Sequence, residues 1–262
     1  MFLPLITLLT DFGLDDAYVG IMKGVMLRIN PAVRLVDITH AVPPQQVLAA
    51  ALILRCAVGF FPDGTIHVAV VDPGVGSTRR AILIEADRGT LVGPDNGVLC
   101  PAAALMGRRK ARWLANDKFF LPHVSQSFHG RDIFAPVAAH LAAGVAPARF
   151  GPPIRDYLPA LPLSERTGDS TWAGRILKID HFGNVITSFR ADEFPNLEGR
   201  EFSLLAGGCE IGAMARNYAA APPGEMVAMV GSGGYLEIAI GRDSAARRIA
   251  CQPGAALELR LR

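Results

Sequence analysis

The sequence predicts an α/β fold: an N-terminal layered α/β domain with a mostly parallel sheet, followed by a C-terminal all-β, barrel-like domain. The chain has 262 residues, which is long for a single hydrophobic core. In the first half, apolar strand-like runs alternate with helix-like segments, as in parallel sheets. After a proline-rich stretch, short strand-like runs separated by glycine turns dominate, as in small barrels and sandwiches.

The strands of the first half are apolar throughout, as expected where helices cover both faces of a sheet. A helix over residues 15–29 places Val19, Met22 and Met26 on one face. A helix over residues 132–143 is ended by Gly144. We expect strands at residues 4–9, 34–38, 65–71, 81–85 and 90–93, the last two near a hairpin, and a further helix at residues 44–60.

The stretch between about Gly151 and Gly168 predicts an interdomain linker, because its four prolines prevent regular structure. These prolines are Pro152, Pro153, Pro159 and Pro162. We therefore place the domains at residues 1–158 and 168–262. The strands expected in the second domain are residues 172–179, 185–189, 201–205, 226–231, 235–240 and 256–261.

Composition argues against two classes of partner. The formal net charge is +2 at pH 7 and the arginines are scattered, so no nucleic-acid partner is expected. The apolar run of residues 2–9 is too short to span a membrane and lacks a basic leader, so we expect a buried strand. The four cysteines have no metal-ligand spacing, and we expect reduced thiols in a cytoplasmic protein.

Polar residues follow the first three predicted strands, at the sheet edge where ligands of α/β proteins bind. Asp11 directly follows a buried strand, where a carboxylate is suited to hydrogen bond a ribose diol. The simpler role for Asp15 and Asp16 is helix capping. The chain lacks GxGxxG after the first strand and a GxxxxGK[ST] motif, so a polyphosphate ligand is not expected.

Three further segments combine glycine with polar side chains. His129 lies beside Gly130 at a helix start, although a histidine there is often only structural or exposed. The segment 180–184 is consistent with a simple hairpin turn. The segment 231–234 is also first a turn, although its glycines let a ligand approach the backbone.

Together these segments resemble the S-adenosylmethionine (SAM) hydroxide adenosyltransferases, relatives of the SAM-dependent fluorinase and chlorinase. The resemblance runs in order through nearly the whole chain. It is carried by TDFGLDDAYVGIMKG (10–24), VVDPGVGSTRR (70–80), GPDNGVL (93–99), FHGRDIFAP (128–136), IDHFGNVITS (179–188) and GSGGYLEIAI (231–240).

The resemblance implies an enzyme that hydrolyses SAM to adenosine and methionine by attack of water on the ribose C5′ carbon. It implies an N-terminal α/β domain and a C-terminal β-barrel domain. It also implies a homotrimer with active sites between the N-terminal domain of one subunit and the C-terminal domain of its neighbour. SAM is then the substrate, and neither a cofactor nor a metal is expected.

By position in these motifs, the resemblance implies a catalytic Asp–Arg–His triad of Asp72, Arg79 and His129. It implies that Asp11 holds the ribose hydroxyls.

In the second domain, the resemblance implies that Asp180 and Asn184 meet the amino and carboxylate end of methionine, with Ser232 nearby. Phe182 would help to enclose the ligand. Gly233 replaces an arginine of the fluorinase, which leaves the contacts of the methionine carboxylate open.

The departures from the fluorinase favour water over halide as nucleophile. Asp72 replaces a tyrosine, Gly130 replaces a serine, and the segment that the fluorinase inserts after the third strand is absent. A sulfonium leaves as a neutral thioether without a general acid, so the site needs only an activated water in line with the C5′–S bond. His129 or Asp72 is expected to accept its proton, with Arg79 favouring hydroxide formation.

Three alternatives remain open from the sequence. The first is a SAM-dependent halogenase that uses chloride, although Asp72 would repel an anion. The second is a SAM or adenosine sensor without turnover. The third is a metal-dependent phosphohydrolase, for which no ligand spacing such as HExxH is present. Its candidate ligands are Asp11, Asp15, Asp16, His40 and His129.

Overall fold

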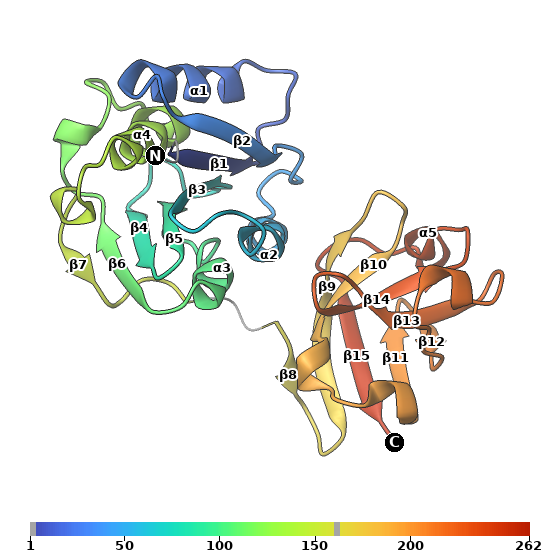
Figure 1. Cartoon of the computed structure of the whole chain (residues 1–262). Helices are drawn as coiled ribbons and strands as arrows, with labels where there is room; N and C mark the ends of the chain where they lie inside the picture. The colour runs from blue at the N-terminus through green and yellow to red at the C-terminus, as the bar shows by residue number, and fades with distance from the viewer. Residues whose placement is uncertain (1–3, 160–162) are drawn as a thin grey trace. The chain divides into compact units, whose positions relative to one another are not determined.

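The computed structural model describes residues 4–159 and 163–262. The chain divides into two compact units, Met1–Leu161 and Pro162–Arg262 (Figure 1). Each unit has hydrophobic clusters of its own. The two units are therefore described separately.

The N-terminal unit is built on a seven-stranded sheet in the order β2-β1-β3-β5-β4-β6-β7. Its strands are β1 (Leu5–Thr10), β2 (Arg34–Thr39), β3 (Thr65–Val70), β4 (Ala81–Ala86), β5 (Gly89–Pro94), β6 (Arg109–Trp113) and β7 (Pro153–Ile154). Its α-helices are α1 (Tyr18–Ile29), α2 (Val47–Val58), α3 (Cys100–Leu105) and α4 (Ala135–Ala142).

Helices cover both faces of this sheet. On one face α1 and α4 pack on Ile6, Leu8 and Val68 (Figure 1). On the other face α2 and α3 pack on Leu9 and Ala69. Burial on both sides explains why β3 is buried at every position, as its continuous apolar pattern predicted.

The prediction of a mostly parallel sheet is correct for only half of it. The pairs β1–β2, β1–β3 and β3–β5 are parallel. The pairs β4–β5, β4–β6 and β6–β7 are antiparallel, so the sheet is mixed. The reason is local: only a short turn joins β4 to β5, and a parallel pair needs a longer crossover.

Besides β7, two elements of this unit were not predicted. Helix α3 is only six residues long, which is too short to show a periodic pattern. Strand β6 has the sequence RKARW, whose charged residues mask its strand character. The predicted capping role of Asp15 and Asp16 is wrong, because α1 begins after Ala17 without a side-chain cap and both aspartates are exposed.

The predicted linker is more structured than expected. Pro153 and Ile154 form β7 on the edge of β6, because proline is tolerated at a sheet edge. Glu165 and Arg166 form the short strand β8, which pairs with β9. Pro162 lies outside the described residues.

The C-terminal unit is an eight-stranded, nearly closed antiparallel sheet in the order β12-β11-β15-β9-β10-β14-β13, with β8 beside β9. Ala213 and Ala215, just after β12, hydrogen bond to Ala228 of β13 and bring the two ends of the sheet together. The strands are β8 (Glu165–Arg166), β9 (Thr171–Ile179), β10 (Val185–Arg190), β11 (Phe202–Ala206), β12 (Cys209–Ile211), β13 (Met226–Val230), β14 (Tyr235–Ile240) and β15 (Ala256–Leu261). One short helix, α5 (Ala245–Ile249), follows β14.

Within the ranges 4–159 and 163–262, no helix is both long and apolar enough to cross a membrane.

The buried His67 in β3 predicts a pH dependence of stability. Burial lowers its pKa from 6.5 to about 4, because the imidazolium is disfavoured away from water. The folded state therefore binds fewer protons than the unfolded state between these values. Stability is full above the unfolded pKa and falls as the pH decreases through this window.

We expect His67→Asn to remove this dependence, whatever its effect at neutral pH. Between about pH 7.5 and about pH 5, the free energy of unfolding of the wild type should fall by about 2 kcal/mol more than that of the variant. Urea unfolding at both pH values measures the difference. The exposed His123→Asn serves as the control and should behave like the wild type. Equal losses in all three proteins would contradict the assignment.

Candidate active site

The N-terminal unit contains a cavity of about 390 Å³ at the carboxyl ends of β1 and β3. This is the edge at which α/β folds bind ligands. Two of the predicted catalytic residues, Asp72 and His129, line it together with Asp11. The other lining residues are Phe12, Tyr18, Pro44, Gln45, Val70, Pro73, Val75, Ser127, Phe128 and Gly130.

Arg79 links the two predicted catalytic side chains that line the cavity. Its Nε donates to Asp72 Oδ1 at 3.0 Å, and its Nη2 donates to Asp72 Oδ2. The same Nη2 lies 2.9 Å from His129 Nδ1. The side chains of Arg79 and Asp72 are only 10% and 5% exposed, so this ion pair is shielded from water. The structure thus brings the predicted triad together.

The contact with Arg79 fixes the tautomer of His129. A guanidinium only donates, so Nδ1 must accept, and the neutral ring carries its proton on Nε2. Burial lowers the pKa of His129, and the charge of Arg79 lowers it further, against the opposing effects of Asp72 and Asp132. His129 is therefore neutral at neutral pH, as the hydrogen bond from Arg79 requires.

Two features hold the loops of the triad together. Gly76 has φ +77°, and a side chain there would collide with the backbone of Gln126, so the loop after β3 lies directly against the segment before His129. The buried carboxylate of Asp132 accepts hydrogen bonds from the backbone N–H and the hydroxyl of Ser125, each at 2.8 Å. Asp132 lies in a π-helical turn, Gly130–Phe134, a feature frequent at functional sites.

Asp11 is held by the loop that follows β2. The backbone N–H of Gln45 donates to Asp11 Oδ2 at 2.8 Å. Gln45 has φ +64°, a left-handed conformation that costs energy for a residue other than glycine. Such strain often occurs at ligand sites. Sequence reasoning did not identify Gln45, because a strained φ has no sequence signal when the residue is glutamine.

An aromatic cluster forms one wall of the cavity. The ring centroids of Tyr18 and Phe128 lie 5.1 Å apart, and those of Phe12 and Phe128 lie 5.7 Å apart. A Cβ at Gly130 would lie 3.2 Å from Phe12, Phe128 and Met22, so the absence of a side chain there allows the cluster to pack. The rings of Phe12 and Tyr18 were missed in sequence reasoning, although both lie in the first motif.

The candidate metal ligands do not gather. His40 contacts Thr10 and Asp37, whereas His129 contacts Arg79. Asp15 and Asp16 are exposed. Across the described part of the chain, no three His, Cys, Asp or Glu side chains are placed to hold a metal ion.

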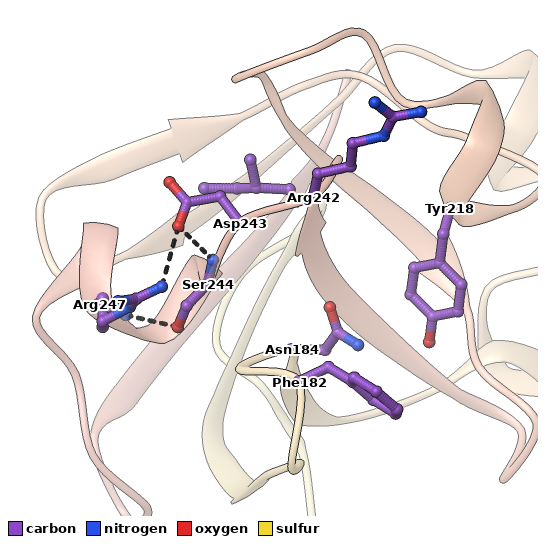
Figure 2. A pocket seen from close by; sticks show the side chains of 8 residues that line it. Phe182, Asn184, Tyr218, Arg242, Asp243, Ser244 and Arg247 are labelled. Atoms are coloured by element: carbon purple, nitrogen blue, oxygen red, sulfur yellow. Dashed lines mark hydrogen bonds and ion pairs between the residues drawn. The ribbon is translucent and has the colours of Figure 1, made fainter.

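The C-terminal unit has a cavity of its own, of about 460 Å³. Phe182 and Asn184, both predicted ligand contacts, line it (Figure 2). Phe182 is 77% exposed, whereas Asn184 is buried. The remaining lining residues were not predicted and are Tyr218, Ile240, Arg242, Asp243, Ser244 and Arg247.

Asp180 organises the turn that carries Phe182 and Asn184. Its Oδ1 accepts from the backbone N–H groups of both residues, at 2.9 and 2.8 Å. Its Oδ2 accepts from Asn184 Nδ2 at 2.8 Å, so the amide oxygen of Asn184 is oriented away from Asp180. Gly183, with φ +87°, lets this turn pack against Ser244.

Ser232 lies in the turn between β13 and β14, and neither it nor Asp180 lines the cavity. A buried carboxylate, Glu237, lies against Gly231 at the start of that turn. Tyr218 donates its hydroxyl to Glu237 Oε2 at 3.0 Å. Burial, reinforced by Glu237, raises the pKa of Tyr218 to about 12, so the phenol keeps its proton at neutral pH.

The Arg79–His129 contact predicts the titration of His129. In Arg79→Gln, the largest cationic influence on His129 is lost while Asp72 remains, so the pKa of His129 should rise. NMR titration of the imidazole resonances measures this change. Arg80→Gln is the matched control, because the adjacent Arg80 pairs with Asp95 and Asp156 instead. An unchanged or lower pKa in Arg79→Gln would contradict the geometry.

Comparison with known proteins matches both units to domains of one family. The family model of the SAM hydroxide adenosyltransferase N-terminal domain matches residues 6–151. The model of the C-terminal domain of the same family matches residues 174–258.

Individual relatives are similar over nearly the whole chain. A protein from Salinispora arenicola named (R)-S-adenosyl-L-methionine hydrolase is 41% identical, over 96% of this chain and 95% of its own. A protein of the same name from Thermus thermophilus is 39% identical, over 96% of this chain and 97% of its own. A fluorinase from an Actinoplanes species is more distant, at 28% identity over 71% of each chain.

Solved structures agree with these sequence matches. The crystal structure of an uncharacterized conserved protein from Thermotoga maritima matches with a TM-score of 0.87 and 35% identity, over 97% of this chain and 99% of its own. Two domain models of one family, in the right order, and relatives of about this identity over full length leave a single assignment: the chain belongs to the SAM hydroxide adenosyltransferase family.

Proposed function

We propose that this chain hydrolyses SAM to adenosine and L-methionine by attack of water on the ribose C5′ carbon. The observation that carries the proposal is the Asp72–Arg79–His129 assembly at the wall of a cavity that also contains Asp11. The names of the similar hydrolases support it.

The main requirement of this reaction is that the protein place the attacking water and the ribose C5′ carbon correctly. The C5′–S bond breaks and its electron pair goes to sulfur, which leaves as the neutral thioether of methionine. The C5′–O bond forms, and the water gives up one proton to a base. Because no acid is needed, holding the water and C5′ in line contributes much of the acceleration.

Asp72 is the better proton acceptor of the two candidates. His129 Nδ1 already accepts from Arg79, so His129 has its proton on Nε2 and no free acceptor nitrogen. Each oxygen of Asp72 accepts one bond from Arg79 and retains a second lone pair. Arg79 Nη1 is buried without a hydrogen-bond partner among the described residues, and we propose that it donates to the attacking water.

Asp72→Asn should lower kcat by about 10²–10⁴-fold, because the amide cannot accept the proton. SAM should still bind, since Asp72 acts on water. Chromatography with mass spectrometry gives the rate, and calorimetry gives the affinity. Asp95→Asn is the matched control: Asp95 is a buried carboxylate paired with the adjacent arginine, Arg80, outside the cavity lining. If Asp72→Asn turned over at the wild-type rate, Asp72 could not be the base.

The identity of the products tests the proposal itself. In water enriched in ¹⁸O, the wild type should release adenosine that carries the label at C5′. With excess chloride, 5′-chloro-5′-deoxyadenosine would establish the halogenase instead, and bound but unconsumed SAM would establish a sensor.

Since the relatives are named for (R)-SAM, we propose the same sulfonium epimer as substrate, so a mixture of the two sulfonium epimers should leave the S epimer.

We further propose that the C-terminal unit supplies the rest of the binding site. Asp180, Asn184 and Ser232 are assigned to the amino and carboxylate end of methionine, and Phe182 to enclosing the ligand. The buried amide of Asn184, held by Asp180, supports this assignment by offering a fixed acceptor to an N–H donor.

We propose that the protein is a cytoplasmic homotrimer in which each site combines the two kinds of unit from neighbouring subunits. Four free thiols are in keeping with that compartment.

Phe182→Ala should raise KM for SAM by about ten-fold, because a large exposed ring is lost from the ligand contact while the fold keeps its core. Native mass spectrometry of the wild type should show three copies. Phe60→Ala, which removes another exposed ring outside both cavities, is the control and should leave KM unchanged. A monomer with full activity would contradict the shared site.

A further inference from the structure

Strand β1 carries two threonines, each bonded to a buried histidine. Thr7 Oγ1 lies 2.8 Å from Nδ1 of His67 on β3. Thr10 Oγ1 lies 2.8 Å from Nδ1 of His40, which follows β2. His67 and His40 are 1% and 4% exposed. The two pairs are alike in chemistry, distance and burial, but Thr7 lies inside the sheet and Thr10 ends the strand, next to Asp11.

The pair at the strand end is extended by charges. His40 Nε2 lies 3.0 Å from Asp37 Oδ1, although without the direction of a good hydrogen bond. Lys23 Nζ lies 2.6 Å from Asp37 Oδ2. Burial alone would raise the pKa of Asp37, but the contacts with Lys23 and His40 outweigh it and lower the pKa, so Asp37 is anionic. The ring of His40 is thus fixed between a hydroxyl and a carboxylate.

Thr10 and His40 also fix the backbone of the two residues that follow Asp11. The N–H of Phe12 donates to Thr10 Oγ1 at 3.2 Å. The N–H of Gly13 donates to the backbone carbonyl of His40 at 2.9 Å. Phe12 and Gly13 are the two residues after Asp11. The direction of the Asp11 side chain and the place of the Phe12 ring therefore depend on these two hydrogen bonds. Among the described residues, no hydrogen bond links the side chains of Thr7 and His67 to a residue that lines the cavity, and the ring of His67 contacts Phe61.

We infer that His40, anchored by Asp37 and acting through Thr10, is a positioning residue that aims Asp11 and Phe12 into the cavity. His40 does not line the cavity, and its effect passes through the backbone of residues 10–13. This inference rests on the proposed function in one respect: the group that Asp11 meets is the ribose diol of the substrate. The Thr7–His67 pair makes the same threonine–histidine contact inside the sheet, away from Asp11, and serves as the comparison.

The experiment compares Thr10→Val with Thr7→Val. Both replace a buried threonine by valine of nearly the same shape and remove the hydroxyl that lies against a histidine Nδ1, so both should lower the unfolding midpoint. Only Thr10→Val should raise KM for SAM, by about ten-fold, with a smaller change in kcat, because Asp11 contacts a non-reacting part of the substrate. Equal KM values for the two variants would overturn the inference.

Ribose discrimination provides a readout that general destabilisation does not move. The wild type should bind adenosine more tightly than 2′-deoxyadenosine in calorimetry. Asp11→Asn and Thr10→Val should each reduce this ratio, and the double variant should reduce it no further than Asp11→Asn alone. Independent, multiplying effects would overturn the inference. Should Thr10→Val not fold, Asp37→Asn, at a partly exposed site, is expected to reduce the ratio in the same direction.

The outcomes separate this inference from the proposed function. If the wild type binds adenosine with ribose discrimination but does not hydrolyse SAM, the proposed function fails, and the variants still test His40. If the wild type hydrolyses SAM and Thr10→Val discriminates as the wild type does, the function stands and the inference fails. A wild type without ribose discrimination overturns the inference directly.

Discussion

The guanidinium of Arg79 connects three segments that are distant in sequence: the end of β3, the loop after it and the π-helical turn that follows His129. Arginine keeps its proton at any physiological pH, so it always acts as a donor. Arg79 forms an ion pair with Asp72 and holds His129 as a neutral acceptor. The close approach at Gly76 and the bonds from Ser125 to Asp132 bring the segments within reach of this one side chain.

The two cavities differ in chemistry. The N-terminal cavity sets carboxylates and the Arg79-bound imidazole against an aromatic wall, which suits a polar sugar beside a reacting carbon. The C-terminal cavity combines two rings, Phe182 and Tyr218, with an oriented amide and two arginines. Both rings are fixed indirectly: Phe182 by the Asp180 turn, and Tyr218 by the buried Glu237. In the C-terminal unit, two carboxylates that do not line the cavity thus set the place of rings that do.

Much of this arrangement was predictable from sequence. The predicted strands and long helices are present, because continuous apolar runs and helical periodicity reflect burial directly. The β4–β5 hairpin was predicted, but the antiparallel pairs β4–β6 and β6–β7 were not, because the charged residues of β6 mask its strand character. Motifs identified Asp72, Arg79 and His129, which the structure brings together. Gln45, Tyr218 and Glu237 were missed, since a strained φ and a buried carboxylate arise only from tertiary packing.

The two-residue strand β7 has a consequence for how the chain can be divided. It covers the outer backbone of β6, which otherwise would present unpaired N–H and C=O groups at the rim of the sheet. The match to the N-terminal family model stops at residue 151, two residues before β7 begins. A fragment cut at that point would expose a bare sheet edge and invite self-association. One that extends through residue 159 keeps the rim covered.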